Sequence, residues 1–534
     1  MWRRTMAPVE GLRIGTSSGR WVLTATVLGS ALAAIDATVV GIALPAIGRD
    51  YGVGLSSLQW VVTAYTLSLA GLLLVAGDLG DRYGRRRIFL LGVAWFVVAS
   101  VGCAAAPNGT LLIVARALQG VGAALLTPGS LAILEASFVP DDRGRAIGAW
   151  SGLGGVATAV GPFLGGWLVE AWSWRLIFLI NLPVAAAVIV VTWRHVPESR
   201  DPRPDGRIDL AGGPLVTVGL VGVTYGLIEG SAVGWSTPAV LGALVGGFAM
   251  LAAFVAWERR APAPMLPLDL FTARQFTATN LVTFVVYAAL GGTLFLLPVQ
   301  LQQVCGYSPL QSGTALLPVT VIMLALSARS GRLAARIGPR LQMSVGPLVV
   351  GAGLALLARV DAAAGYLTEV LPAVAVFGLG LALTVAPLTA TALAAVPQRH
   401  AGLASAVNND VARVANLIAV AVLPAVGGIT GASYLRPAEF SRGFHTAVLL
   451  AAALCGLGGL IAALTIRNPA RPARLARPRI PAGRPIPAGV GGSAPPPRPS
   501  AALHCCLDAP PLADPTGDVP QGLVGRPKTV GPGP

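Results

Sequence analysis

The stretch Gly77–Arg87, with the sequence GDLGDRYGRRR, decides how the rest of the chain is arranged. It is a dense group of charges, and it separates two apolar segments at approximately 58–76 and 88–106. A shorter, degraded copy, GRLAARIGPR at Gly331–Arg340, also lies between two apolar segments. The pair predicts a membrane protein built from two related halves, with a charged turn on one face of the bilayer.

The composition agrees with a polytopic, all-α membrane protein. Of the 534 residues, 54% are hydrophobic and only 11% are charged, whereas soluble domains carry about 25% charged residues. The net charge of +15 does not indicate a nucleic-acid partner, because the arginines fall in short loops between apolar runs, and Lys528 is the only lysine. A nucleic-acid-binding protein would gather its basic residues on one soluble face.

Membrane-spanning segments are the main structural prediction. A spanning helix needs about 20 mostly apolar residues, and fourteen segments satisfy this. They lie approximately at 21–45, 58–76, 88–106, 110–134, 145–169, 174–193, 209–228, 238–257, 276–300, 312–328, 341–358, 367–394, 403–430 and 445–466. The first could instead begin as a cleaved signal peptide at Trp21–Ala34, although its apolar run continues to Pro45.

Arginine placement predicts the orientation of the chain. The protein is expected in the plasma membrane. Every second loop is rich in arginine, and because positive loops stay on the cytoplasmic side, these loops are expected in the cytoplasm. An even number of helices then puts both termini in the cytoplasm. The bilayer is thus an expected partner, and the protein is expected to function as a monomer.

Matching features recur about 254 residues apart, for example Gly84 and Gly338. This repeat predicts two six-helix bundles with two further helices inserted between them. The expected parts are a cytoplasmic arm at 1–20, an N-terminal bundle at 21–196, a linker with two inserted helices at 197–275, a C-terminal bundle at 276–466, and a disordered tail rich in Pro, Gly and Arg at 467–534.

Charged residues inside apolar segments are candidate functional residues. Asp36 and Arg116 each lie within a predicted span, where an ionised group costs about 2.5–3.5 kcal/mol on insertion scales. Each is therefore expected to face a cavity or a partner. For Asp36 the alternatives are a proton or cation site and a buried structural hydrogen bond; for Arg116 they are coupling to that acid and ordering of the bundle.

Four further groups of residues are candidates, and most have a structural alternative. The turn could act as a conformational latch through Asp81, or could only fix topology. Pro162 between glycines could bend and pack its helix. The residues of a possible polar cavity could instead be neutral scaffolding; they are Gln119, Asn409, Asp410, Arg413 and Asn416. Glu135 and Glu229, near predicted helix ends, are secondary candidates for a proton or cationic-substrate site, or are exposed to water.

Several motifs resemble the major facilitator superfamily. Gly77–Arg87 resembles its signature between the second and third helices, which implies a latch made by Gly77, Asp81, Arg82, Gly84, Arg85 and Arg86. The copy resembles the second-half version but has Ala335 in place of the acid. Arg116–Ala124 resembles the fourth-helix motif, in which the arginine tunes a nearby acid during proton coupling.

Other motifs resemble the fourteen-helix drug:proton antiporter branch. Ile35–Pro45, which contains Asp36, resembles its first-helix motif, although Gly41 stands where that branch usually has Asn. The antiporter-type motif of the fifth helix is matched by Gly161, Pro162, Gly165 and Gly166. The stretch Trp174–Pro183 is similar to the drug exporters.

The resemblance implies a proton-coupled antiporter that exports lipophilic or cationic small molecules from the cytoplasm by alternating access. Alternatives are a dedicated exporter of one endogenous metabolite, such as an antibiotic or siderophore, and a membrane sensor without transport. No metal or cofactor is expected, and the energy source would be the proton gradient. The protein is not expected to be an enzyme, because the only lysine follows Pro527, outside any phosphate-binding loop, and no catalytic motif is present.

Overall fold

The structure of the protein is a computed structural model that describes residues 11–200, 209, 211–262, 264–397, 401–431, 434 and 436–468. The chain divides into two units, Met1–Ala470 and Arg471–Pro534. The second unit, and with it nearly all of the predicted tail, lies outside the described residues, as does the first half of the predicted arm. The described part of the first unit is helical apart from loops and one β-bridge between Leu12 and Phe138.

Fourteen helical segments in the described residues are long and apolar enough to cross a membrane, which confirms the predicted number. The elements of the first half are α1 (Ser17–Tyr51), α2 (Leu55–Tyr83), α3 (Arg85–Ala105), α4 (Gly109–Ser137), α5 (Pro140–Ala171), and the pair α6 (Leu176–Leu179) and α7 (Asn181–His195), which together form one span. The inserted helices are α8 (Gly212–Val233) and α9 (Pro238–Glu258).

The second half begins with η1 (Leu268–Thr272) and contains α10 (Arg274–Val299) with η2 (Gln300–Val304), α11 (Pro309–Ala315) with α12 (Leu317–Ile337), α13 (Pro339–Leu357), η3 (Tyr366–Val370) with α14 (Leu371–Ala394), α15 (Ala401–Val426) and α16 (Pro437–Thr465).

Local signals set many of the helix starts. The side chains of Thr16 and Asn108 cap α1 and α4, and Ser308 forms a capping box with Gln311 at the start of α11.

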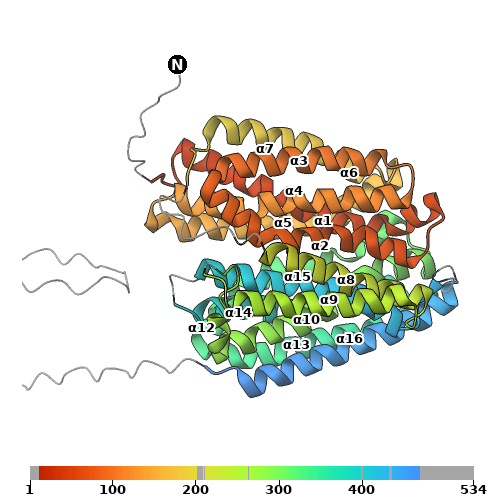
Figure 1. Ribbon diagram of the computed structural model, residues 1–534. Helices are drawn as coiled ribbons and strands as arrows, with labels where there is room; N and C mark the ends of the chain where they lie inside the picture. The colour runs from red at the N-terminus through yellow and green to blue at the C-terminus, as the bar shows by residue number, and fades with distance from the viewer. Residues whose placement is uncertain are drawn as a thin grey trace, which may run out of the picture. The chain divides into compact units, whose positions relative to one another are not determined.

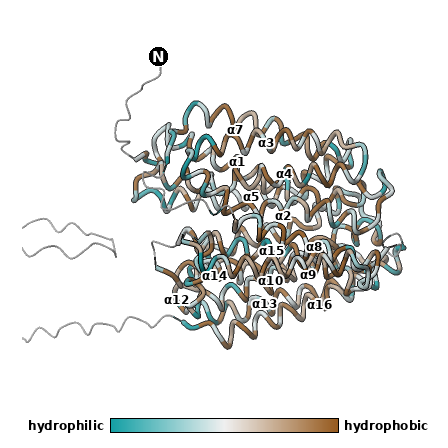
Figure 2. Tube along the Cα trace, viewed as in Figure 1, coloured by the Kyte–Doolittle hydropathy of each residue, from teal (hydrophilic) through white to brown (hydrophobic). Residues whose placement is uncertain are grey.

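The helices pack in two sets with the same pattern of neighbours. In the first set α1 packs on α5 and α3 on α4; in the second, the corresponding α10 packs on α15 and α13 on α14. Figure 1 shows α1–α7 together, in red to yellow, and α10–α16 together, in green to blue. Figure 2 shows that hydrophobic residues follow the lengths of the helices and hydrophilic residues gather at their ends, as a bilayer requires.

The stretch Gly77–Arg87 is almost entirely helical, and the tight turn expected within it is confined to Gly84. The helix α2 continues to Tyr83 and α3 starts at Arg85, which leaves only Gly84 between them, with φ +112°. The copy is built in the same way around Gly338, with φ +91°. A single glycine suffices because it adopts positive φ without a Cβ clash, and the charged residues on either side keep helical hydrogen bonds.

The Gly84 and Gly338 turns lie at the same ends of the two bundles, here named the motif end; the opposite end is the far end. In the far half, one apolar core joins both bundles, with α1 residues such as Val39 and Ile47 beside residues of α10 and α13–α16. In the motif half, a separate core around Phe89 and Leu73 belongs to the first bundle alone. The two bundles are therefore packed together mainly in the far half.

Candidate functional site

A buried ion pair joins the two charged residues found inside predicted spans. Asp36 lies in the middle of α1 and Arg116 in α4, and each residue is only 1% exposed. Arg116 Nη1 donates to Asp36 Oδ2 at 2.5 Å, and Arg116 Nε donates to the carbonyl of Val61 at 3.1 Å. The pair satisfies the requirement that a charge removed from water must have a partner of opposite sign.

Three neutral residues complete the network around Asp36. Gln119 Nε2 and Asn181 Nδ2 donate to Asp36 Oδ1 at 2.7 and 2.9 Å, and both also reach the hydroxyl of Ser100. Gln119 Oε1 accepts from Arg116 Nη1 at 2.6 Å. Gln119 thus bridges the acid and the base, and Asp36 has donors on both of its oxygens.

Asn181 and Ser100 were not identified as site residues from the sequence. Asn181 is the first residue of α7, directly after the irregularity at Ile180 that separates α6 from α7. A buried Asn at a break in a membrane helix is a usable signal, because an amide at that depth needs a polar partner. Ser100 offers no such signal, since serine often bonds to its own helix backbone.

Aromatic rings close the site around the guanidinium group. The Tyr65 ring centroid lies 4.3 Å from Arg116 Cζ, and that of Phe178 lies 5.7 Å away. Such contacts stabilise a desolvated cation by about 2 kcal/mol. The charges are therefore held in a dry setting, where adding a proton to Asp36 removes the main electrostatic attraction on Arg116.

A cavity of about 420 Å³ lies between the two bundles at the motif end. Its lining includes Asp81 and Arg85 from the first bundle and Asn409 and Arg413 from α15. Asp36 is not among the lining residues. The ion pair is thus closed off from this cavity in the conformation described.

Three of the six residues proposed as a latch line this cavity, namely Gly77, Asp81 and Arg85; the other three, Arg82, Gly84 and Arg86, are not among its described lining residues. Asp81 pairs with Arg85 at 2.7 Å and keeps 41% of its side chain exposed, while Arg82 pairs with Asp78 at 3.3 Å. Gly77 and Gly80 line the cavity beside them. The α15 segment that starts at Gly402 forms the opposite wall, so Asp81 faces the second bundle across open space.

The polar residues of α15 are separate from the Asp36 network. Asp410 Oδ1, Arg413 Nε and Asn416 Oδ1 are buried without a hydrogen-bond partner, and among the described ion pairs none joins Asp410 to Arg413. Asn409 is exposed and its amide donates to the carbonyl of Ser405. Gln119, grouped with these residues in the sequence prediction, lies instead beside Asp36.

The glycine motif of α5 packs that helix against two neighbours. A Cβ atom at Gly161 or Gly165 would collide with α1 at Thr38 or Val39, and one at Gly166 would collide with Pro309 at the start of α11. The carbonyl of Pro162 lies against Gly313 in α11. Small residues thus allow α5 to touch both its own bundle and the other one.

Polar contacts between the bundles reinforce the far end. Gln59 Nε2 donates to the Val420 carbonyl at 2.6 Å, Gln302 Nε2 donates to the Ile42 carbonyl at 2.9 Å, and the Leu310 amide donates to Glu170 Oε2 at 2.9 Å. These three hydrogen bonds between the bundles all lie at this end. The two bundles are thus in contact at the far end and are separated by a cavity at the motif end.

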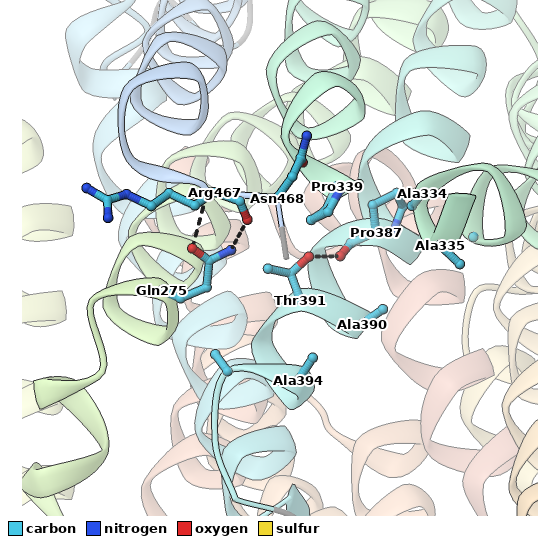
Figure 3. Close-up of a pocket in the computed structure, with 12 residues that line it drawn as sticks. Gln275, Ala334, Ala335, Pro339, Pro387, Ala390, Thr391, Ala394, Arg467 and Asn468 are labelled. Carbon is cyan, nitrogen blue, oxygen red and sulfur yellow. Dashed lines mark hydrogen bonds between the residues drawn. The ribbon is translucent and has the colours of Figure 1, made fainter. Parts of the chain in front are cut away.

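A second cavity, of about 430 Å³, lies within the C-terminal bundle at the motif end (Figure 3). It is lined mainly by small apolar side chains around the degraded copy, including Ala335, which replaces the acid of the first half. Gln275 exchanges two hydrogen bonds with the backbone of Arg467 at its rim, as Figure 3 shows. Its described lining residues include no carboxylate, so they do not repeat the arrangement around Asp81.

Comparison with known proteins gives relatives of similar length. The chain is 37% identical to the multidrug resistance protein Stp of Mycobacterium tuberculosis over 76% of this chain and 75% of that protein. It is 39% identical to the puromycin resistance protein pur8 of Streptomyces alboniger, over 78% and 83% of the two chains, and 35% identical to the methylenomycin A resistance protein of Bacillus subtilis, over 84% and 94%.

Solved structures agree on the fold. An auto-inhibited peptide transporter of the POT family superposes with a TM-score of 0.63 at 16% identity, over 85% of this chain and 99% of that one. The family model described as Major Facilitator Superfamily matches residues 26–420. With its fourteen spans and paired bundles, the chain belongs to the Major Facilitator Superfamily.

Proposed function

We propose that this protein exports lipophilic or cationic small molecules from the cytoplasm in exchange for protons, by alternating access. The observation that carries the proposal is the buried Asp36–Arg116 pair with its own set of donors. The relatives named for resistance to drugs and antibiotics support an export function. The energy source in this proposal is the proton gradient, without a cofactor.

The proposed orientation puts the motif end in the cytoplasm of a bacterial cell, with the protein in the plasma membrane and both termini inside. Arginine enrichment at the motif end supports it. The conformation described is then inward-facing, since its inter-bundle cavity lies at that end. Substrate would enter this cavity from the cytoplasm or the inner leaflet, and a single chain contains both bundles that form it.

Proton coupling follows from the charge balance of the pair. When Asp36 is ionised, it holds Arg116 and Gln119, and through them joins α1 to α4. When Asp36 is protonated, Arg116 keeps its bonds to Gln119 and the Val61 carbonyl but loses its counter-charge. The free energy of the site thus changes with the proton, and that change can shift the equilibrium between two bundle arrangements.

The remaining site residues have supporting roles in this proposal. Asp81, facing α15 across the cavity, would hold the bundles together at the motif end once that end closes. Arg413 and Asn409 line the same cavity, where they would contact polar groups of the substrate. The glycine contacts of α5 with α11 would open when the far end opens.

Efflux from inside-out vesicles tests the proposal. With an imposed pH gradient and a panel of lipophilic cations, the wild-type protein should accumulate at least one compound in the lumen and release protons from it. Asp36→Asn, which keeps the side-chain shape, should abolish both movements while the protein remains folded. Unchanged proton-driven accumulation in this variant would refute the role of Asp36.

A second candidate is a dedicated exporter of one metabolite made by the same cell. It is favoured by similarity to the tetracenomycin C resistance and export protein of Streptomyces glaucescens, at 36% identity over 78% of this chain and 77% of that protein. The same vesicles separate the two candidates. A dedicated exporter would respond to one chemical class in the panel, whereas a multidrug exporter would respond to several unrelated ones.

A further inference from the structure

Two buried acids meet where the inserted helices reach the motif end. Asp209 lies just before α8 and is 8% exposed, and Glu258 is the last residue of α9 and is 3% exposed. A Cβ atom placed at Gly212 would fall against both Asp209 Oδ2 and Glu258 Oε1. The two oxygens therefore face each other beside the Gly212 backbone, within hydrogen-bond reach.

These two facing oxygens have no donor in the described part of the chain. Asp209 Oδ2 and Glu258 Oε1 are both buried without a hydrogen-bond partner of the usual donor–acceptor kind. Two ionised carboxylates in contact and shielded from water repel strongly, so such a pair normally retains one proton. A proton between the oxygens would give each of them a partner.

The other hydrogen bonds indicate which acid holds the charge. Asp209 Oδ1 accepts from the indole of Trp257 at 2.8 Å and from the amides of Gly212 and Ala211 at 2.8 and 3.2 Å. Glu258 has two such donors, the amide of Leu266, which bonds to Oε2 at 3.0 Å, and the amide of Met265. Since more donors stabilise the anion better, Asp209 is the ionised member and Glu258 carries the proton.

The pKa of Asp209 agrees with this assignment. Burial would raise it, but hydrogen bonds from Gly212, Trp257 and Glu258 outweigh burial and hold the pKa below its ordinary value. No basic group neutralises the pair in the described part of the chain. Arg259 and Arg260, which follow Glu258, are exposed and form no ion pair with either acid, and α8 contributes only uncharged residues here.

We propose that Asp209 and Glu258 form a proton-binding site, in which Glu258 donates a shared proton to Asp209 and so fastens the motif ends of α8 and α9 together. The site is separate from Asp36, on other helices and at the motif end rather than in the middle of a span. Loss of the shared proton leaves two facing anions, so the fastening weakens as pH rises.

Infrared spectroscopy of the purified full-length protein tests the proton directly. A protonated carboxylic acid has a carbonyl band that a carboxylate lacks. At neutral pH the difference spectrum between wild type and Glu258→Gln should contain this band, and Asp209→Asn should also remove it, because Asn can donate to an ionised Glu258. The exposed acid Asp269 supplies the matched control, and Asp269→Asn should keep the band.

Thermal unfolding measured against pH tests the consequence for stability. The unfolding midpoint of wild type should fall as pH rises above neutral, and this fall should be absent from Glu258→Gln, whose amide donates to Asp209 at every pH. A wild-type spectrum without the Glu258 band would overturn the proposal. So would a midpoint that depends on added sodium or potassium and not on pH, which would indicate a bound cation. Neither readout involves transport, so each result is independent of the proposed function.

Discussion

Asp36 accepts three hydrogen bonds, of which Arg116 supplies one; Asn181 supplies another, at 2.9 Å. Because this bond is part of the buried network around Asp36, replacing Asn181 with Leu should weaken the network without removing either charge. A lost hydrogen bond to a charged group is worth about 1.5–3 kcal/mol, and about 1.4 kcal/mol is tenfold in an equilibrium. We therefore expect the rate of proton-driven efflux in inside-out vesicles to fall by about tenfold or more in Asn181→Leu.

Asn408 supplies the matched control for that measurement. It is a buried Asn in the C-terminal bundle whose amide donates to Asn280 and Thr283, both uncharged. Asn408→Leu should lower the unfolding midpoint and leave the rate of proton-driven efflux near that of wild type. If both variants slowed efflux equally, the effect of Asn181 would be one of packing and not of its bond to Asp36.

At the level of residues, the charged members of the site could be predicted from the sequence, whereas the uncharged residues that hydrogen-bond to them could not. Asp36 and Arg116 stand out because an ion in an apolar helix needs a partner. Ser100 does not stand out, because many hydroxyl groups in these helices form their hydrogen bonds within their own helix. The hydroxyls of Thr26 and Ser130, for example, donate to backbone carbonyls of the helices that contain them. Only the packing of four helices identifies Ser100 as a member of the network.

Gly84 is the one residue that separates α2 from α3, and its backbone has φ +112°. A side chain at this position would be strained and would also collide with the carboxylate of Glu198. Gly84→Ala should therefore destabilise the protein by roughly 1–3 kcal/mol. Gly80 is the control, because it is helical and a Cβ atom there meets nothing within 4 Å. Gly80→Ala should keep or raise the unfolding midpoint, because alanine is the better helix former, and equal losses in both variants would contradict this account.

Glu198 connects the linker to the start of α3. Its Oε1 accepts from the amides of Arg86 and Ser199, at 3.1 and 3.2 Å. After the last helix of the second half, Asn468 does the same for α13, accepting from the amide of Arg340 at 3.0 Å. The acid lies at the positive end of a helix dipole, so Glu198→Ala should cost about 1 kcal/mol.

The neighbouring Ser199 tests whether that loss belongs to the carboxylate. Its backbone carbonyl accepts from the amide of Arg85 at 3.0 Å, but its hydroxyl forms no hydrogen bond in the described structure. Ser199→Ala should therefore unfold like wild type. The Glu198→Ala deficit should also shrink at high salt, because part of it is an interaction with partly exposed arginines. A deficit that salt leaves unchanged would show that packing, not charge, is responsible.

At the level of elements, the number of spans was predictable and their ends were not. The first span was expected at 21–45, yet α1 runs from Ser17 to Tyr51. Hydropathy marks only the apolar part of a helix, whereas the helix continues into the interface as long as its polar side chains reach water. The same reason explains why α2 and α3 reach Gly84 through residues expected to form a turn.

At the level of the whole first unit, α8 lies across one seam between the bundles. Leu67 of α2, Leu220 of α8 and Leu417 of α15 form one small apolar cluster. The polar contacts of α8, however, go to α2: Thr217 Oγ1 donates to the Gly71 carbonyl at 3.2 Å, and Glu229 accepts from the Trp60 indole at 3.0 Å. The sequence predicted two inserted helices but not their place, because their apolar surfaces show no strongly preferred face.

This asymmetry predicts which bundle carries the inserted helices during transport. Hydrogen bonds fix α8 to α2, while its contact with α15 is apolar and can slide, so α8 should move with the N-terminal bundle. With the native cysteines replaced, a cross-link between cysteines at Leu220 and Leu417 should abolish efflux until it is reduced. A cross-link between cysteines at Val75 and Gly213, which joins α2 to α8, should leave efflux intact. The opposite pattern would mean that α8 travels with the C-terminal bundle, and its contacts with α2 would then have to break in every cycle.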